Sequence, residues 1–146
     1  MAFQIETSIH INAPREKVWE ILTDFDAYPE WNPFIQKISM PDDSLKVGNK
    51  LSAYIKAPKS SGMTFKPTLV AHEAQISFAW LGHLFISGLF DGRHSFELKT
   101  NKEGGTTFIH SEQFSGMLVP LFKSSMPKFK RGFESMNEAL KIKAEK

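Results

Sequence analysis

The chain of 146 residues contains no cysteine, and this absence excludes several classes of protein. A scaffold stapled by disulfides and a metal site built on thiolates both require cysteine. No stretch approaches the roughly 18 consecutive apolar residues of a membrane-spanning helix. The first residues, MAFQIETSIHINAP, alternate polar and apolar side chains and lack the apolar core of a signal peptide. We therefore expect a cytoplasmic protein without stable membrane insertion.

The sequence also lacks a strong excess of charge of either sign. Its 18 lysines and arginines are balanced by 16 acidic residues, which gives a formal net charge of +2. Nucleic-acid-binding domains concentrate positive charge on one face, so this balance predicts no nucleic-acid partner. Several motifs of site chemistry are missing as well: HExxH or helical i, i+4 histidine pairs, the GxSxG elbow and the GxGxxG loop. We expect neither a metal nor a cofactor.

What the chain has in excess is phenylalanine, with 13 Phe against 2 Tyr. An apolar fraction of 41% is typical of globular proteins, and 146 residues suffice for one sizeable core. We expect a single domain over residues 1–146. Because phenylalanine is bulky and has no polar tip, this domain has much apolar surface to bury or to offer to a ligand.

Hydrophobic periodicity predicts one strand, two short helices and then a series of strands. Residues 3–11 alternate polar and apolar side chains, as a half-buried strand does. Pro14 precedes a short amphipathic helix over residues 15–23, and Pro29 and Pro33 limit the next helix to a turn or two. Further strands are expected at residues 35–40, 50–57, 63–74, 75–81, 93–100 and 106–115.

The C-terminal part of the chain changes to helical spacing. Its large apolar residues recur at intervals of three and four, which predicts one buried stripe on a long helix: Phe122, Met126, Phe129, Phe133, Met136 and Leu140. Pro127 leaves two alternatives open. Either the helix is kinked there, or Ser124 or Ser125 caps a helix whose first turn contains the proline.

This order of elements predicts an α+β fold. Six to seven sequential strands joined by short turns form a curved antiparallel β-sheet. The long C-terminal α-helix must bury its single apolar stripe against the concave face of that sheet. The space between helix and sheet is either filled by large side chains or left as a cavity.

Five stretches resemble a known family. Residues 11–25 (INAPREKVWEILTDF) and 28–33 (YPEWNP) are similar to the opening of the SRPBCC superfamily (START-like, helix-grip), in particular its polyketide cyclase/dehydrase-like branch. Later segments that begin at residues 80, 88 and 112 (WLGH, GLFDGRHSF and EQFSGMLVP) fit the same branch. The resemblance covers nearly the whole chain and implies the helix-grip fold. Members include lipid carriers, metabolite binders, aromatase/cyclases and chaperone regulators, so the resemblance implies a ligand-binding domain without choosing its ligand.

The candidate polar groups of a pocket are His94, His110 and Glu112. Alternation puts His94 on one face of its strand with Phe96, and puts His110 and Glu112 together on one face of the last strand. If these faces point inward, burial and mutual charge would shift the pKa values and suit a general acid or base. Otherwise the three groups only complete the core. The opposite phase, with Ile109 inside, also stays open.

The other ligand-binding candidates are apolar side chains of the expected strands, lid and helix: Trp31, Tyr54, Phe65, Phe78, Trp80, Phe96, Phe108, Phe114, Met126, Phe129 and Phe133. Each has an alternative role in the core, and Trp31 has one as a plug beside a capping Asn32. The apolar segment 84–90 is an entrance loop, a dimer contact or a segment packed on its own domain.

These observations favour a protein that binds or carries a small hydrophobic ligand, such as a lipid, polyketide or aromatic metabolite, between sheet and helix. The alternative from the enzyme class is a cyclase or dehydratase in which the His/Glu cluster moves protons. Another alternative is a protein-interaction module that uses segment 84–90 and has a solid core. We expect a binding protein rather than an enzyme, and leave a homodimer open.

Overall fold

Two antiparallel sheets form the fold of the computed structural model, which describes residues 2–41, 44–84 and 86–146. The larger sheet has the order β1-β8-β7-β6-β5. Its strands are β1 (Ala2–Ile11), β8 (Thr106–Ser115), β7 (Phe90–Thr100), β6 (Ser77–Leu84) and β5 (Thr68–Glu73). The smaller sheet has the order β2-β3-β4, with β2 (Ile35–Ser39), β3 (Ser52–Ile55) and β4 (Met63–Phe65).

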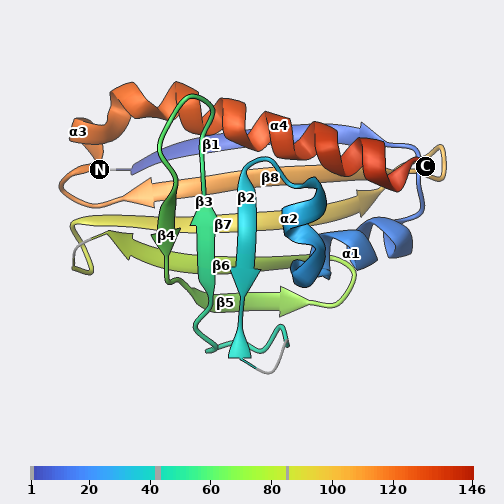
Figure 1. The fold of residues 1–146 in the computed structure, drawn as a ribbon, viewed down its shortest axis with the longest axis horizontal. Coiled ribbons are helices and arrows are strands. Elements are labelled where there is room, and N and C mark those ends of the chain that lie inside the picture. The colour runs from blue at the N-terminus through green and yellow to red at the C-terminus, as the bar shows by residue number, and fades with distance from the viewer. Residues whose placement is uncertain (1, 42–43, 85) are drawn as a thin grey trace.

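The smaller sheet runs across the face of the larger one (Figure 1). Backbone hydrogen bonds join the two sheets at one edge. Leu51 N–H donates to the Pro67 carbonyl at 2.9 Å, and Leu69 N–H donates to the Asn49 carbonyl at 2.8 Å. These bonds pair residues 49–51, just before β3, with residues 67–69 at the start of β5, and so connect the two sheets at this edge.

The described part of the chain has eight strands, where the sequence predicted six to seven. The difference arises at residues 63–74, which were expected to form one strand. The structure divides this stretch into β4 and β5, which belong to different sheets. Pro67 lies between them. The φ angle of a proline is fixed by its ring, and its nitrogen carries no hydrogen to donate to a neighbouring strand. The chain changes sheet at this residue.

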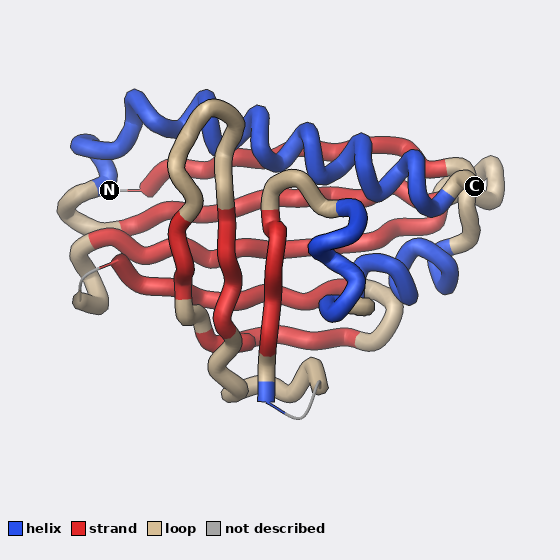
Figure 2. Tube along the Cα trace, viewed as in Figure 1, coloured by secondary structure: helices blue, strands red, loops and turns tan. Residues whose placement is uncertain are grey.

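The helices lie where the sequence predicted them (Figure 2). They are α1 (Arg15–Thr23), the 3-10 turn η1 (Phe25–Ala27), α2 (Tyr28–Trp31), α3 (Val119–Phe122), the 3-10 turn η3 (Lys123–Ser125) and α4 (Met126–Ala144). Pro127 lies in the first turn of α4, as one of the two alternatives required. Ser125 occupies the N-cap position, but its side chain makes no capping hydrogen bond.

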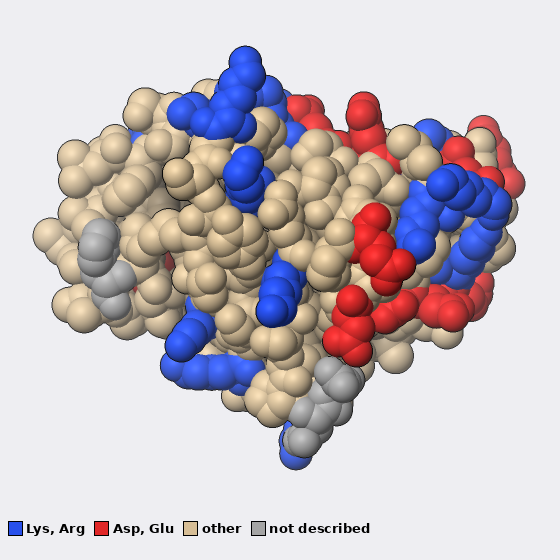
Figure 3. Space-filling model, in the orientation of Figure 1, with Lys and Arg blue, Asp and Glu red and all other residues tan. Residues whose placement is uncertain are grey.

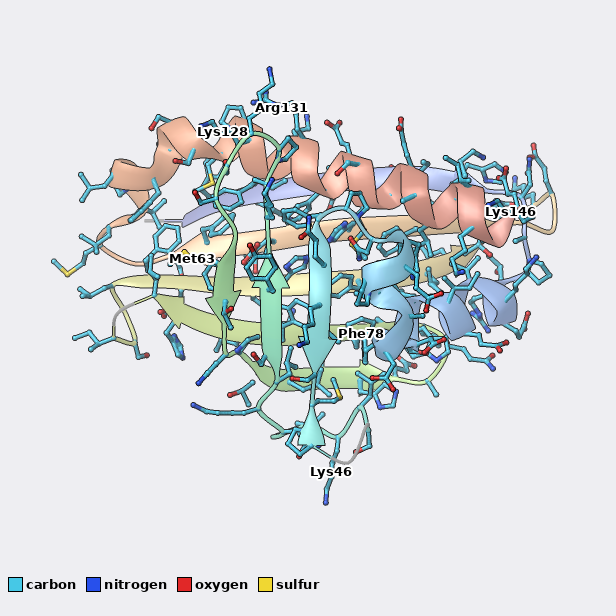
Figure 4. The ribbon with its side chains drawn as sticks, viewed as in Figure 1. Lys46, Met63, Phe78, Lys128, Arg131 and Lys146 are labelled. Atoms are coloured by element: carbon cyan, nitrogen blue, oxygen red, sulfur yellow. The ribbon has the colours of Figure 1, made fainter. Side chains whose placement is uncertain are left out.

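The apolar stripe of α4 is buried against the larger sheet. Phe133, Met136 and Leu140 are each 0% exposed. Burial of one such side chain is worth about 1.5–3 kcal/mol, so this stripe fixes the helix on the sheet. Lys128 and Arg131 point away from the interior on the outer side of the helix (Figure 4). Among the described helices, none has the length and apolar character needed to span a membrane.

Candidate functional site

A pocket of about 150 Å³ lies between the two sheets and the C-terminal helices. Its lining is almost entirely apolar and comes from both sheets, from α3 and from α4: Phe34, Ile55, Met63, Phe65, Pro67, Trp80, Gly82, His83, Leu84, Phe90, Gly92, His94, Glu112, Phe114, Phe122 and Phe129. Figure 3 shows a hollow at the left of the molecule, beside β4, in a region with few charged side chains.

The pocket exists because two glycines interrupt the inner face of the larger sheet. Antiparallel register pairs Gly82 with Gly92 across β6 and β7, and Gly92 with Phe114 across β7 and β8. Gly82, Gly92 and Phe114 form one row of cross-strand neighbours on the inner face of the sheet. Because the two glycines have no side chains, this row is bare over β6 and β7. A Cβ at Gly82 would meet only Pro67, at 3.6 Å, so this part of the wall borders open space.

The neighbouring row of the sheet gives the pocket its polar end. Trp80 pairs with His94, and His94 pairs with Glu112, on β6, β7 and β8. His94 Nδ1 lies 3.6 Å from Glu112 Oε1. Gly92 lies against the other carboxyl oxygen, Oε2, where a Cβ would clash with it. The two glycines thus leave room both for the cavity and for the carboxyl group.

A chain of buried hydrogen bonds continues from His94 away from the pocket. His94 Nε2 and His110 Nε2 are 2.7 Å apart, and His110 Nδ1 is 2.9 Å from Asn137 Oδ1 on α4. Asn137 Nδ2 donates to Thr7 Oγ1 at 2.9 Å, and the Thr7 hydroxyl donates to the His110 carbonyl at 2.8 Å. These hydrogen bonds connect β7, β8, α4 and β1, and they give a partner to both ring nitrogens of His110 and to Nε2 of His94.

Burial governs the protonation of the three titratable groups. It lowers the pKa of His94 well below 6.5, and neighbouring His110 adds to this effect. It lowers the pKa of His110 to about 3, although hydrogen bonds with the Asn137 side chain and the Phe133 backbone act in the opposite direction. It raises the pKa of Glu112 to about 8. These shifts all favour the uncharged form at neutral pH.

The structure settles the phase of the last strand that the sequence left open. His110 is 0% exposed and faces inward with Phe108 and Phe114. Glu112 shares this face, and 18% of its side chain is exposed at the pocket. Of the three polar candidates, His94 and Glu112 therefore line the pocket, while His110 lies behind His94.

Six of the residues predicted to bind ligand line the pocket: Phe65, Trp80, His94, Glu112, Phe114 and Phe129. Their contact with a ligand stays a prediction. Others lie in the core behind the pocket wall: Phe78, Phe96, Phe108, His110, Met126 and Phe133. Figure 4 shows Phe78 in the interior behind β2. The sequence could not separate these groups, because both face inward with the same periodicity.

Two further candidates lie elsewhere. Tyr54 lines a different, more open hollow with Lys37 and Thr64 on the smaller sheet. Trp31 packs its ring on Tyr28 at 5.1 Å. The adjacent Asn32 side chain accepts hydrogen bonds from the backbone N–H groups of Phe34 and Ile35, at 2.9 Å each, and so forms the turn into β2. The hydrogen bonds agree with the structural alternative for Asn32, and contact of Trp31 or Tyr54 with a ligand stays a prediction.

Several lining residues were missed as individual candidates: Phe34, Ile55, Met63, Pro67, Gly82, His83, Gly92 and Phe122. Phe122 was part of the predicted helix stripe, and Leu84 and Phe90 belong to segment 84–90, whose Phe85 lies outside the described residues. Gly82 and Gly92 carry the same strand phase as Trp80 and His94. That shared phase is the sequence signal that could have found them.

Exposed apolar side chains surround this end of the molecule. Met63 of the pocket lining is 50% exposed, and Ile86, Met117 and Leu121 are more exposed still. Met117 N–H donates to the Gly88 carbonyl at 3.4 Å, which joins the turn after β8 to the loop before β7. In the described residues, no group of three or more His, Asp or Glu side chains could hold a metal ion.

The fold and the pocket define a START-like domain of the helix-grip type. A protein-family profile described as "Polyketide cyclase / dehydrase and lipid transport" matches residues 2–145, and the chain belongs to this family. No curated protein matches the chain in sequence.

Solved structures share the fold at low sequence identity. The aromatase/cyclase Zhui from Streptomyces sp. R1128 is 14% identical, with a TM-score of 0.77 over 99% of this chain and 94% of that one. A START superfamily protein from Mycobacterium smegmatis is 18% identical, with a TM-score of 0.71 over 97% of each chain. The chain spans 50% of the di-domain ARO/CYC BexL from the BE-7585A biosynthetic pathway, which is 14% identical with a TM-score of 0.76 over 99% of this chain.

Proposed function

We propose that this chain is a single ligand-binding domain that holds a small, mainly apolar molecule in the pocket between the sheets and α4. The observation that supports this proposal is the bare row at Gly82 and Gly92, which leaves a standing apolar cavity of about 150 Å³ with one polar end. Apolar cavities of this size bind small apolar molecules readily, and a few polar groups orient them.

The volume limits the size of the ligand. About 150 Å³ accommodates roughly one substituted aromatic ring, or the corresponding part of a longer molecule that extends through the mouth. Burial of apolar area contributes roughly 25 cal/mol per Å² before the costs of association. A single-ring compound is therefore expected to bind with a Kd on the order of 0.1–1 mM. A lipid, polyketide or aromatic metabolite of larger area would bind more tightly.

A cavity-filling variant tests the proposal. Gly82→Val adds a branched side chain at a position where a Cβ meets only Pro67 at 3.6 Å, so the fold should persist while the cavity is filled. Ser95→Val is the matched control, because Ser95 lies on the opposite face of β7 from His94. Titration of α-methylstyrene, followed by Trp fluorescence, should show binding to the wild type and to Ser95→Val, and at least ten-fold weaker binding to Gly82→Val. Equal binding to all three proteins, or to none, would overturn the proposal.

A second candidate function is a cyclase or dehydratase, and the observation that favours it is the titratable pair His94 and Glu112 in the pocket wall. A neutral carboxyl beside an imidazole can donate and take back a proton during loss of water or ring closure. His110 lies behind the pair and would hold the His94 ring rather than touch a substrate. Turnover of a β-hydroxyketone to its enone by wild type, and its loss in Glu112→Gln, would support this function. Absence of turnover would exclude it for that class of substrate.

The proposal includes the location and partners expected from the sequence. The protein is expected to be cytoplasmic and to bind a small apolar molecule but no nucleic acid. A homodimer is left open as an alternative. Light scattering after size-exclusion chromatography tests the last point. A concentration-dependent mass would support the dimer, and a constant mass of one chain would exclude it.

A further inference from the structure

We infer that the pocket presents its ligand with a hydrogen-bond donor, the protonated carboxyl of Glu112, and therefore selects an uncharged molecule with an acceptor oxygen, such as a ketone or ester. This inference rests on the proposed binding function and names the ligand class. It follows from the direction of the buried hydrogen-bond chain, which can be traced atom by atom from Thr7 to His94, whose other ring nitrogen faces Glu112.

At Thr7 the donor and acceptor of each hydrogen bond can be assigned in only one way. The Thr7 hydroxyl lies 2.8 Å from the His110 carbonyl oxygen, which cannot donate, so the hydroxyl donates. Its oxygen then accepts from Asn137 Nδ2, at 2.9 Å. This contact orients the Asn137 amide, because a flipped amide would place its oxygen against a hydroxyl whose proton is already used. Asn137 Oδ1 therefore faces His110 Nδ1, at 2.9 Å.

The histidine tautomers follow from this orientation. An amide oxygen only accepts, so His110 Nδ1 carries a proton. A neutral imidazole has a single N–H, which leaves a lone pair on His110 Nε2. His94 Nε2 lies 2.7 Å away and must donate to it. His94 Nδ1 is then the acceptor nitrogen, and it faces Glu112 Oε1 at 3.6 Å.

A negatively charged carboxylate would be repelled by this lone pair. Glu112 and His94 therefore share one proton, which lies either on the Glu112 carboxyl or on His94 Nδ1. The His94 ring is stacked between Phe96, at 4.5 Å, and Phe133, at 4.9 Å, and is 1% exposed. A charged imidazolium and carboxylate would both lose solvation there, and such a loss can exceed their attraction. The neutral pair, with the proton on Glu112, is the favoured form. The raised pKa of Glu112 agrees with this assignment.

The carboxyl proton is available to a ligand. Among the described residues, neither carboxyl oxygen of Glu112 makes a hydrogen bond, and 3.6 Å to His94 Nδ1 exceeds hydrogen-bond length. Ile5, an apolar residue, lies opposite Glu112 on β1, and Gly92, which has no side chain, lies against Oε2 on β7. A ligand acceptor in the pocket would be the natural partner of this proton.

The charges around the pocket exclude an acidic ligand. Of the described lining residues, only His83, His94 and Glu112 can carry charge, and none is a lysine or arginine. His83 Nδ1 is 2.7 Å from Asp91 Oδ1, so its charge, when present, is already paired at the mouth. An anionic ligand would enter an apolar cavity with no cation to meet it.

Four single-ring probes of similar size test whether the pocket prefers a neutral acceptor, an apolar group, an anion or a cation. They are acetophenone with a carbonyl acceptor, α-methylstyrene with a CH₂ group in place of that oxygen, benzoate with an anion, and benzylamine with a cation. At pH 7 acetophenone should bind wild type roughly three- to ten-fold more tightly than α-methylstyrene, as expected for one hydrogen bond. Benzoate and benzylamine should both bind more weakly than α-methylstyrene.

Two variants attribute this preference to Glu112. Glu112→Gln keeps a neutral donor of the same shape, so it should retain the preference for acetophenone. Glu112→Leu has no donor and should bind acetophenone and α-methylstyrene equally. Infrared difference spectra between pH 6 and 10 give a readout that needs no ligand. The wild type should lose a protonated-carboxyl band as the pH rises, and this band change should be absent in Glu112→Gln.

Each outcome separates this inference from the proposed function. If no probe binds to the wild type, the pocket-binding proposal itself fails. If acetophenone and α-methylstyrene bind equally, or benzylamine binds most tightly, the pocket binds ligand but Glu112 is not a donor, and the inference is overturned. A carboxylate band already complete at pH 6 would overturn it as well.

Discussion

Gly132 on α4 lies against the ring of Phe34, and a Cβ at Gly132 would clash with that ring. Phe34 is 2% exposed, packs on Phe133 at 5.3 Å and also lines the pocket. The close approach of helix and ring sets how far α4 sits from the smaller sheet. A change in this contact is therefore expected to alter both stability and the shape of the pocket.

We expect Gly132→Ala to destabilise the protein although alanine is the better helix former. Overpacking a buried contact costs about 1–3 kcal/mol, and the gain in helix propensity offsets about 1 kcal/mol of this. Urea denaturation should show a net loss of up to about 2 kcal/mol. Phe34→Leu should relieve the clash, so the double variant should lose less than the sum of the single variants. Lys130→Ala, exposed on the same helix, is the control.

Thr7→Val should weaken the buried hydrogen-bond chain at its anchor. The substitution keeps the shape of the side chain but leaves Asn137 Nδ2 and the His110 carbonyl without their partner. Each unsatisfied buried group costs about 1–3 kcal/mol. Denaturation measures the loss, and Thr64→Val on the exposed surface of β4 should change stability by less than about 0.5 kcal/mol.

The same variant tests the histidine tautomers. NMR of the imidazole nitrogens in wild type should show a proton on His110 Nδ1 and on His94 Nε2. In Thr7→Val the orientation of the Asn137 amide is no longer fixed, and a mixture of tautomers is expected. A wild-type protein with the proton on His110 Nε2 would contradict the direction of the chain.

The free energy of unfolding should reach a maximum near pH 6.5. His94 and His110 have lowered pKa values, so below about 6.5 the unfolded chain binds more protons and stability falls as the pH drops. Glu112 acts with the opposite sign. Its pKa rises from 4.5 to about 8 on folding, so the folded state holds its extra proton in that window and stability falls as the pH increases through it.

Denaturation at a series of pH values from 5 to 9 checks this profile. Each group changes the free energy by no more than about 1.4 kcal/mol per pH unit. The two histidines outweigh Glu112 below pH 6.5, and their contribution fades over about the next pH unit, where Glu112 dominates. Glu112→Gln should abolish the decline between pH 6.5 and 8 and leave the acid side in place. A wild-type profile that is flat over this interval would contradict the burial of a neutral carboxyl.

Asp91→Ala should loosen the loop at the mouth of the pocket. Asp91 Oδ1 lies 2.7 Å from His83 Nδ1, and its carboxylate accepts from the Gly88 backbone N–H at 3.1 Å. Removal of this acceptor should speed hydrogen exchange of the Gly88 amide, because its protecting bond is lost. Asp91→Asn is the matched variant and should exchange more slowly than Asp91→Ala, since its side-chain oxygen still accepts. Equal exchange in wild type and Asp91→Ala would show that the bond does not hold the loop.

Local patterns in the sequence determined the elements of this fold. Period-two alternation located β1, β7 and β8, and the three-four spacing from Phe122 to Leu140 located the helix that packs on them. These predictions held because each pattern reflects one buried face. The division of residues 63–74 was not predicted, since the effect of Pro67 depends on which sheet receives each half.

Only the tertiary structure decided where the pocket lies. Phe96 and Phe114 share the inward phase, yet Phe96 is buried in the core and Phe114 lines the cavity. The difference arises from what covers each residue, the helices and the smaller sheet, and from the bare row at Gly82 and Gly92. The polar chain likewise brings Thr7 to Asn137, which are 130 residues apart. Periodicity fixes the face on which a side chain lies, but long-range packing determines what that face meets, and therefore which side chains can reach a ligand.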